Sequence, residues 1–246
     1  GLAARAGCFA ALSAADGFRG DLALLDGPWM ENAQGVELDR EAFSANRATD
    51  TVLPTVSFKP YFSAKQMIGT IAGFEEILAR GVTPAEIDRI EVSGPNNYAK
   101  MIDNGVVAGN RLSSATSAPY QLALAAYHHD GLYDVARSEY VLTDEITALM
   151  DKVSVTADAA LGDYLPDRWP ARVAVYAGAR KEEVEVIDAP GDPGDAFDRN
   201  QVIAKFHAIN DPLIGEAAAG DWIDAAQGSI SDQAALAELG RRYLGL

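Results

Sequence analysis

The chain has 246 residues, of which 48% are hydrophobic and 23% charged, a composition typical of a soluble globular protein with a sizeable core. Its formal net charge of −16 argues against nucleic acid or an anionic membrane as the partner, because both would repel it. The single cysteine, Cys8, excludes an internal disulfide, and we expect a reducing, cytoplasmic setting.

The first 15 residues predict a helix that Asp16-Gly17 ends. Alanine and other small residues fill almost every face of this segment, so we interpret it as a buried helix and not as a targeting segment. A second short helix is predicted over residues 20–30, followed by a polar connection over 36–50. Because the chain begins with Gly, we expect it to be processed, trimmed or part of something longer.

The middle of the chain mixes helices and strands. Residues 63–80 predict an amphipathic helix with apolar side chains at spacings of three and four, and Gly81 ends it. Thr83 and Pro84 predict a helical turn that leads into a strand ending at Gly94. Short helices are predicted over 96–103, 117–129 and 143–151. Strands are predicted over 152–156, 171–176 and 183–187, the last two joined by a hairpin loop.

Helical patterns return near the end of the chain, over residues 200–209 and 231–243, after the Pro/Gly boundary "APGDPGD". The order of helices, a mixed middle and helices again predicts an α+β fold. No apolar stretch approaches the roughly 20 residues that a bilayer-spanning helix needs.

Several common functional motifs are absent from the sequence: the phosphate-binding loop, the dinucleotide-binding fingerprint and the G-x-S-x-G nucleophile elbow. The histidines, His128, His129 and His207, have no metal-ligand spacing, and one cysteine cannot complete a structural zinc site. We interpret His128 and His129 as residues favoured by the dipole at a helix end, and His207 as a helix-surface residue. No metal or cofactor site is predicted.

Two residues are candidates for a site, each with a simpler alternative. Pro60 pushes Lys59 toward an extended conformation, which would present the lysine to a pocket and away from a helix surface. The alternative is a solvated lysine. Tyr120 follows a proline at the start of a helix, and its alternative is a core residue with its hydroxyl at the edge of the core. Periodicity alone does not decide between these interpretations.

Five segments, in order along nearly the whole chain, resemble the MmgE/PrpD family, which includes 2-methylcitrate dehydratase, cis-aconitate decarboxylase and iminodisuccinate epimerase. The segments are "GLAARAGCFAALSAADGFRG", "FKPY", "SAPYQLALAAYHHDG", "RWPARVAVYAGARKEEVEV" and "APGDPGDAFDRNQVIAKFHAI". The resemblance implies part of a large helical domain over residues 1–53, an α+β lid domain over 54–190, and a helical segment over 191–246 that returns to the helical domain.

The resemblance also implies a chemistry. It places Lys59 and Tyr120 in the active-site region of a cofactor-free lyase, of the dehydratase or decarboxylase kind, or of an isomerase that acts on a small di- or tricarboxylate. A lysine beside a substrate carboxylate would offset its charge and help to stabilise a developing enolate. A tyrosine with a lowered pKa could pass a proton.

Two departures from the family pattern affect the expected reaction and the expected assembly. The family's dehydratases and decarboxylases usually carry a histidine five residues after the lysine, where this chain has Ala64, which cannot move a proton. The resemblance covers only the family's C-terminal half. We therefore expect a second, mainly helical chain to supply the N-terminal half. The alternative is a non-catalytic binding or regulatory subunit that keeps the family fold.

Overall fold

The computed structural model describes residues 1–21, 23–24, 27–37, 39, 41, 55–107, 110–135 and 142–244. The chain divides into two compact units, Gly1–Leu53 and Pro54–Leu246. Most of the predicted connection over residues 36–50 lies outside the described residues, as does the boundary between the two units. The assignment of residues 1–53 and 191–246 to one helical domain around a lid stays a prediction.

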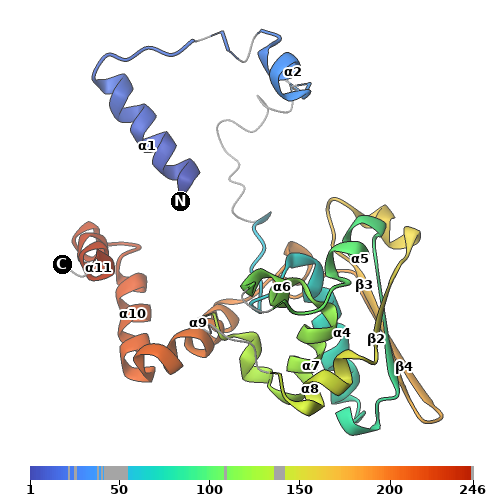
Figure 1. Ribbon diagram of the computed structural model, residues 1–246. Coiled ribbons are helices and arrows are strands. Elements are labelled where there is room, and N and C mark those ends of the chain that lie inside the picture. Colours follow the sequence, from blue (N-terminus) through green and yellow to red (C-terminus); the bar gives the residue numbers. More distant parts are fainter. Residues whose placement is uncertain are drawn as a thin grey trace. The chain divides into compact units, whose positions relative to one another are not determined.

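The first unit contains α1 (Leu2–Ala15) and α2 (Trp29–Gln34), drawn in blue in Figure 1. Helix α1 ends as predicted, at Gly17 with a φ of +90°, a conformation that glycine adopts without strain. The predicted burial of α1 is wrong for this chain, since no residue of the helix is buried and Leu2 and Phe9 are 84% and 73% exposed.

The second predicted helix, over residues 20–30, is also wrong. The described residues of that stretch form turns and irregular backbone before Trp29. Proline lacks the N–H group of a helix interior but fits the first turn, and here the carbonyl of Pro28 accepts a hydrogen bond from the Asn32 N–H at 2.8 Å. The helix therefore begins around Pro28 and continues past it.

The second unit is built on a four-stranded mixed sheet of order β2-β1-β3-β4, formed by β1 (Arg89–Gly94), β2 (Val153–Ala157), β3 (Ala171–Ala177) and β4 (Arg180–Val186). Strands β1 and β2 are parallel, whereas β1–β3 and β3–β4 are antiparallel. Ile90 and Val92 of β1 are buried, whereas Arg89, the first residue of the strand, is exposed. The alternation is that of a sheet with one covered face, and the fold is α+β, as predicted.

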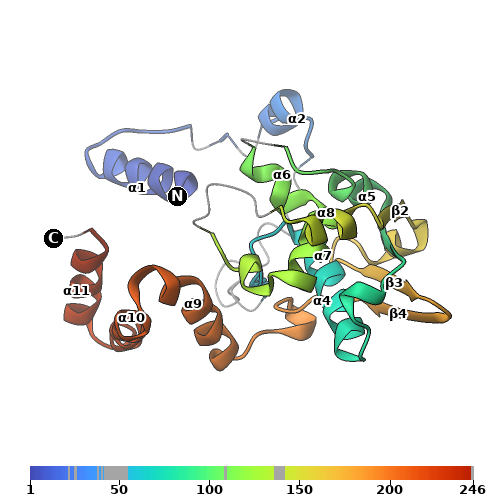
Figure 2. The ribbon, with the colours of Figure 1, turned by 60° about the horizontal axis from the view of Figure 1, so that its bottom comes forward.

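Helix α4 (Ile68–Ala79) covers the inner face of the sheet against β3 and β4. Gly69 and Gly73 make this contact close, since a Cβ on Gly73 would lie 3.4 Å from Cγ2 of Val186. Helix α7 (Ala118–Tyr127) packs on α4, and α8 (Asp144–Met150) packs on α7, as Figure 2 shows. The buried apolar side chains of these elements form one core.

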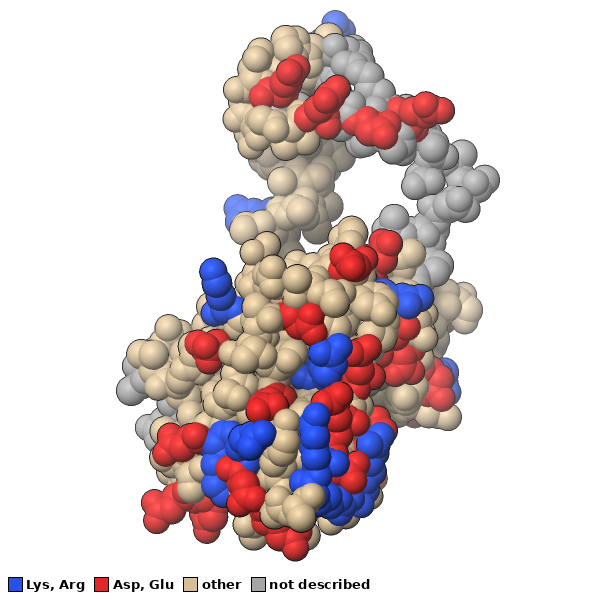
Figure 3. All heavy atoms as spheres, turned by 90° about the vertical axis from the view of Figure 1, so that its right-hand side faces the viewer, with Lys and Arg blue, Asp and Glu red and all other residues tan. Residues whose placement is uncertain are grey.

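The opposite face of the sheet is covered by ion pairs. Arg172 of β3 lies 2.7 Å from Asp158 and 2.5 Å from Glu185, and Lys181 lies 2.7 Å from Glu183. Figure 3 shows Lys and Arg side chains interleaved with Asp and Glu over the lower part of this surface. The mixed charge makes this face a solvated surface and not a single-sign patch.

Two shorter helices flank the core: α5 (Asn96–Ile102), which packs on β2, and α6 (Arg111–Thr116), which packs on α7. The C-terminal part consists of α9 (Arg199–Ile214), α10 (Glu216–Gly228) and α11 (Gln233–Leu244). Helix α10 packs on both of its neighbours. None of the helices in the described part of the chain combines the length and the apolar character needed to cross a membrane.

The sequence missed helices α6 and α10 and overestimated the length of the β3–β4 loop. Ala177 and Arg180 are paired, so the loop consists of Gly178 and Ala179, with Gly178 at a φ of +57°. Helix α10 was missed because of its glycines at positions 220 and 228, which are poor helix formers, although its alanines favour a helix.

Gly191 is in close backbone contact with Phe58, in the segment that precedes the core. Its φ is +85°, its carbonyl accepts a hydrogen bond from the Phe58 N–H at 2.8 Å, and an added Cβ would lie 1.9 Å from the Phe58 carbonyl oxygen. Gly81 has a similar φ of +92° with open space around it.

We expect Gly81→Ala to lower the free energy of unfolding by about 1–2 kcal/mol from the left-handed backbone alone, and Gly191→Ala to lower it further because of the clash. Chemical denaturation measures both, and equal losses would contradict this account.

Candidate functional site

The Lys-Pro-Tyr segment is held at three points along its length. The N–H of Phe58 donates to the Gly191 carbonyl, that of Phe62 to the Leu132 carbonyl, and that of Ala64 to the Ala115 carbonyl, each at 2.8 Å. Backbone from three separate stretches of the second unit therefore fixes residues 58–64. Residues 56–59 have no regular secondary structure, so Lys59 lies on an anchored loop.

Lys59 is exposed, and its ammonium donates a hydrogen bond to the Ser63 carbonyl at 2.8 Å. The next two residues, Pro60 and Tyr61, are buried. The side chain therefore leaves the loop where the backbone turns into the core. Its stem is ordered, while its charge faces no carboxylate within ion-pair distance among the described residues.

Tyr120 lies in the first turn of α7 and has no exposed surface. The Ser117 hydroxyl accepts a hydrogen bond from the Tyr120 N–H at 3.3 Å and caps the helix. The ring belongs to the core formed by α4, α7 and the sheet. The structure thus places one predicted site residue at the surface and the other inside the core.

Ala64 lies at the position where the family's dehydratases and decarboxylases usually have a histidine. It is half-buried, packs against the core, and precedes a 3₁₀ turn, Lys65–Met67. A methyl side chain has no proton to give or accept, so any proton transfer at this point of the site must come from another residue.

A second group of polar residues, missed by the sequence analysis, surrounds Glu75 of α4. The hydroxyl of Tyr61 donates a short hydrogen bond to one carboxylate oxygen, and His129 Nε2 lies 2.8 Å from the other. The ring of Tyr133 packs edge-on against both Tyr61 and His129, with centroids 5.8 and 5.7 Å away. His129 begins a 3₁₀ turn, His129–Leu132, so its contact with Glu75 and not only the helix dipole accounts for its position.

The environment of Tyr61 keeps its hydroxyl protonated. Burial, together with the negative charge of Glu75, raises the pKa of Tyr61 far above its usual value. Burial and the Glu75 charge also raise the pKa of Tyr133. Both hydroxyls therefore stay protonated at neutral pH, and that of Tyr61 donates to Glu75 and does not serve as a base.

A cleft of about 500 Å³ lies beside this group. Its lining comes from the Lys-Pro-Tyr loop, the turn after α7, the 190–197 loop and α9, and consists of Pro60, Tyr61, His129, Asp130, Tyr133, Pro190, Phe197, Gln201, Ala204, Lys205 and Ala208. The half-buried Lys205 has a lowered pKa, first because of its burial and then because of the charge on Lys59. Lys59 itself does not appear among the lining residues, but it precedes Pro60 and Tyr61, which do.

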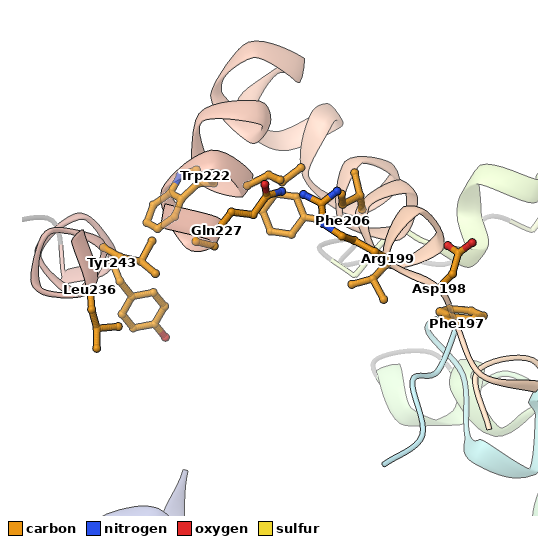
Figure 4. Close-up of a pocket in the computed structure, with 14 residues that line it drawn as sticks. Phe197, Asp198, Arg199, Phe206, Trp222, Gln227, Leu236 and Tyr243 are labelled. Carbon is orange, nitrogen blue, oxygen red and sulfur yellow. The ribbon is translucent and has the colours of Figure 1, made fainter. Parts of the chain in front are cut away.

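The larger hollow of the second unit is a groove of about 780 Å³ between α9, α10 and α11. Figure 4 shows Phe206, Trp222 and Tyr243, one from each helix, around it. Its other lining residues are also mostly apolar. Such a lining suits the packing of another apolar surface and has few groups for catalysis.

In the described part of the chain, no group of three or more His, Cys, Asp or Glu side chains is arranged to hold a metal ion. The polar residues near the cleft are instead a lysine pair, two tyrosines and a Glu–His pair. Tyr61 could have been suspected from its place in Lys-Pro-Tyr. Glu75, His129 and Lys205 come from distant stretches of the chain, and no sequence motif joins them.

Comparison with known proteins gives one family. The model of the MmgE/PrpD C-terminal domain matches residues 66–228. A comparison with curated proteins gave no match. The matched residues include all four strands of the sheet, helices α4–α8 that cover it, and α9 and α10. Because they make up more than half of the 246 residues, the chain belongs to the MmgE/PrpD family, through its C-terminal domain.

Proposed function

We propose that this chain is a subunit or half of a cofactor-free lyase or isomerase that acts on a small di- or tricarboxylate. The observation that carries the proposal is an exposed lysine, Lys59, held on an anchored loop beside a cleft, in a chain whose family contains such enzymes. The lysine has no carboxylate partner among the described residues, so its charge is available to a substrate carboxylate.

The proposed chemistry uses the lysine as an electrostatic group. Loss of a proton next to a carboxylate or carbonyl leaves negative charge on oxygen, and a fixed ammonium stabilises that charge as it develops. The hydrogen bond to the Ser63 carbonyl limits the freedom of the Lys59 side chain. Less reorganisation is then needed when the substrate binds.

Tyr120 is proposed as the proton carrier. Its burial shields the hydroxyl from bulk water, which favours transfer to a bound substrate over exchange with solvent. The role requires the reacting carbon to come within hydrogen-bond reach of that hydroxyl. Ala64 leaves no competing group at its own position.

The second candidate function is a non-catalytic binding or regulatory subunit. Ala64, half-buried and without a titratable group where the family's dehydratases usually have histidine, is the observation that favours it. In that case Lys59 binds a carboxylate ligand without turnover.

We also propose that a second, mainly helical polypeptide completes the protein. Two apolar surfaces support this proposal, each within its own unit: the exposed apolar residues of α1 and the groove between α9, α10 and α11. Apolar helix faces of this kind pack most readily against other apolar helices. A second copy of this chain is the competing occupant.

The first prediction concerns Lys59. In the complete assembly, assayed with a panel of small di- and tricarboxylates, we expect Lys59→Ala to abolish turnover because the developing negative charge loses its counter-charge. Stability should change by less than about 0.5 kcal/mol, since the side chain is exposed. Lys100→Ala, an exposed lysine on α5, serves as the control and should retain full activity. A fully active Lys59→Ala assembly would return Lys59 to the role of a solvated lysine.

The next prediction separates the two candidate functions. Tyr120→Phe removes only the hydroxyl and keeps the ring in the core, so we expect turnover to fall by roughly 100-fold or more, the scale of a general acid or base. Near-UV circular dichroism should show an unchanged core. Full activity would place the proton carrier elsewhere. No turnover of any polycarboxylate by the intact assembly would favour the binding subunit.

The last prediction concerns assembly. Leu236 lines the groove, Leu213 of α9 does not, and both are 55% exposed. We expect Leu236→Asp to weaken association with the helical partner at least about tenfold, because it places a charge in an apolar contact, whereas Leu213→Asp should have little effect. Native mass spectrometry gives the mass and fraction of bound partner. A cooperatively unfolding monomer, or a homodimer sensitive to Leu236→Asp, would contradict the proposal of a second polypeptide.

A further inference from the structure

The cleft beside the Lys-Pro-Tyr loop contains a cation that the proposed function does not use. Lys205 lies on α9 and lines the cleft, opposite the loop and the turn after α7. Gln201, one turn earlier on α9, also lines it, but its side-chain oxygen accepts the Asp198 N–H at 2.8 Å as part of the helix cap. Lys205 is therefore the charged residue that α9 contributes to the lining of this cleft.

Lys205 has no counter-ion in the part of the chain that the structure describes. Other lysines do: Lys65 pairs with Asp192, and Lys181 with Glu183 at 2.7 Å. The chain has 36 acidic and 20 basic residues, so carboxylates are abundant. Leaving a half-buried ammonium unpaired costs free energy, and an acidic chain has many ways to avoid that cost.

The carboxylate groups in and next to the cleft lining do not fill this role. Glu75 is already bound by the Tyr61 hydroxyl and by His129. Asp130 lines the same cleft without approaching Lys205 within ion-pair distance in the described structure. The anion that would compensate Lys205 therefore does not come from the described residues.

The neighbour of Lys205 is another cation. Burial, together with the charge on Lys59, lowers the pKa of Lys205, which means that its protein surroundings disfavour the charged lysine. An anion bound between the two ammonium groups would be attracted to both and would remove their mutual repulsion.

The cleft has the size and surface for a small organic acid. Its volume of about 500 Å³ falls within the usual range of small-molecule sites. Proline, phenylalanine and alanine side chains, Pro60, Pro190, Phe197, Ala204 and Ala208, form much of the wall and suit a carbon skeleton. The described residues that line the cleft include no arginine, although bidentate arginine contacts are common where proteins bind phosphate.

We propose that this cleft binds a carboxylate group of a small organic acid through Lys205, with Lys59 as the second cation. The inference rests on the proposed function for the substrate class and adds to it a binding residue, Lys205. It also gives the substrate an orientation: one carboxylate lies between the two lysines, and the carbon skeleton lies along the apolar wall.

The test is isothermal titration calorimetry on the full 246-residue chain, with citrate, succinate, inorganic phosphate and the neutral trimethyl ester of citrate as probes. We expect binding of citrate or succinate, weaker binding of phosphate, and none of the ester. Lys205→Gln should weaken carboxylate binding by about tenfold or more, the usual effect of a lost hydrogen bond to a charged group. Lys205→Arg should keep most of the affinity because it keeps the charge.

Lys100→Gln, which removes the same charge from exposed α5, is the control for net charge and should bind as the parent chain does. Thermal unfolding of each variant checks that the fold is kept. Unchanged carboxylate affinity in a folded Lys205→Gln chain overturns the proposal. So does phosphate binding as tight as that of citrate, equal binding of the ester, or no binding of any carboxylate.

Turnover by the complete assembly separates this inference from the proposed function. If the assembly is active and Lys205→Gln changes neither KM nor carboxylate binding, the inference fails while the function stands. If carboxylates bind in a Lys205-dependent way but the assembly turns none over, the binding site stands and the proposed enzyme activity fails.

Discussion

The close packing of α4 on strands β3 and β4 is the contact on which the position of the candidate site depends. Gly69 and Gly73 let the helix approach the sheet to the distance at which a Cβ would already touch Val186. The opposite side of the same helix contacts α7 and carries Glu75. Glu75 in turn binds Tyr61 and His129, and so joins the Lys-Pro-Tyr loop to the turn after α7. Helix α4 thus fixes the Lys-Pro-Tyr loop and the 3₁₀ turn after α7.

Charge is distributed unevenly in this acidic chain. On the outer face of the sheet, basic and acidic side chains alternate and pair. Exposed pairs of this kind contribute little to stability, but they leave no net field on that face. Lys59 and Lys205 differ from them because neither has a carboxylate partner among the described residues; Lys205 lines the cleft, and Lys59 precedes Pro60 and Tyr61, which also line it. The site proposals depend on this contrast. The basic residues of the outer sheet face have acidic partners, whereas Lys59 and Lys205 have none among the described residues and are proposed to bind a ligand.

The exposed apolar surfaces of the chain, unlike the cleft, call for another protein surface and not for a small ligand. The inner face of the sheet is buried by α4, α7 and α8 within the second unit. Helix α1 and the groove of α9–α11 keep large apolar side chains exposed. Burial of a large apolar side chain is worth about 1.5–3 kcal/mol, so these helices gain stability only when another surface covers them. Assembly and activity are for this reason linked in the proposed function.

The sequence by itself determined the elements whose signals are local. Helix α1 with its glycine stop, α4 with its apolar spacing, the capped α8 and the strands of the sheet were predicted because periodicity, caps and turns act within a few residues. The resemblance indicated the family and drew attention to Lys59. The burial of α1 was predicted wrongly, since apolar composition shows that a helix needs a partner but not that this chain provides one.

Only the tertiary structure decided which side chains meet. Glu75, His129 and Lys205 are separated by more than 50 residues from one another, and their meeting with the Lys-Pro-Tyr loop follows from the packing of α4, α7 and α9. The exposure of Lys59 and the complete burial of Tyr120 likewise depend on long-range packing. Local sequence sets backbone preferences, but which charges lose their water and which neighbours they face is fixed only when distant segments pack together.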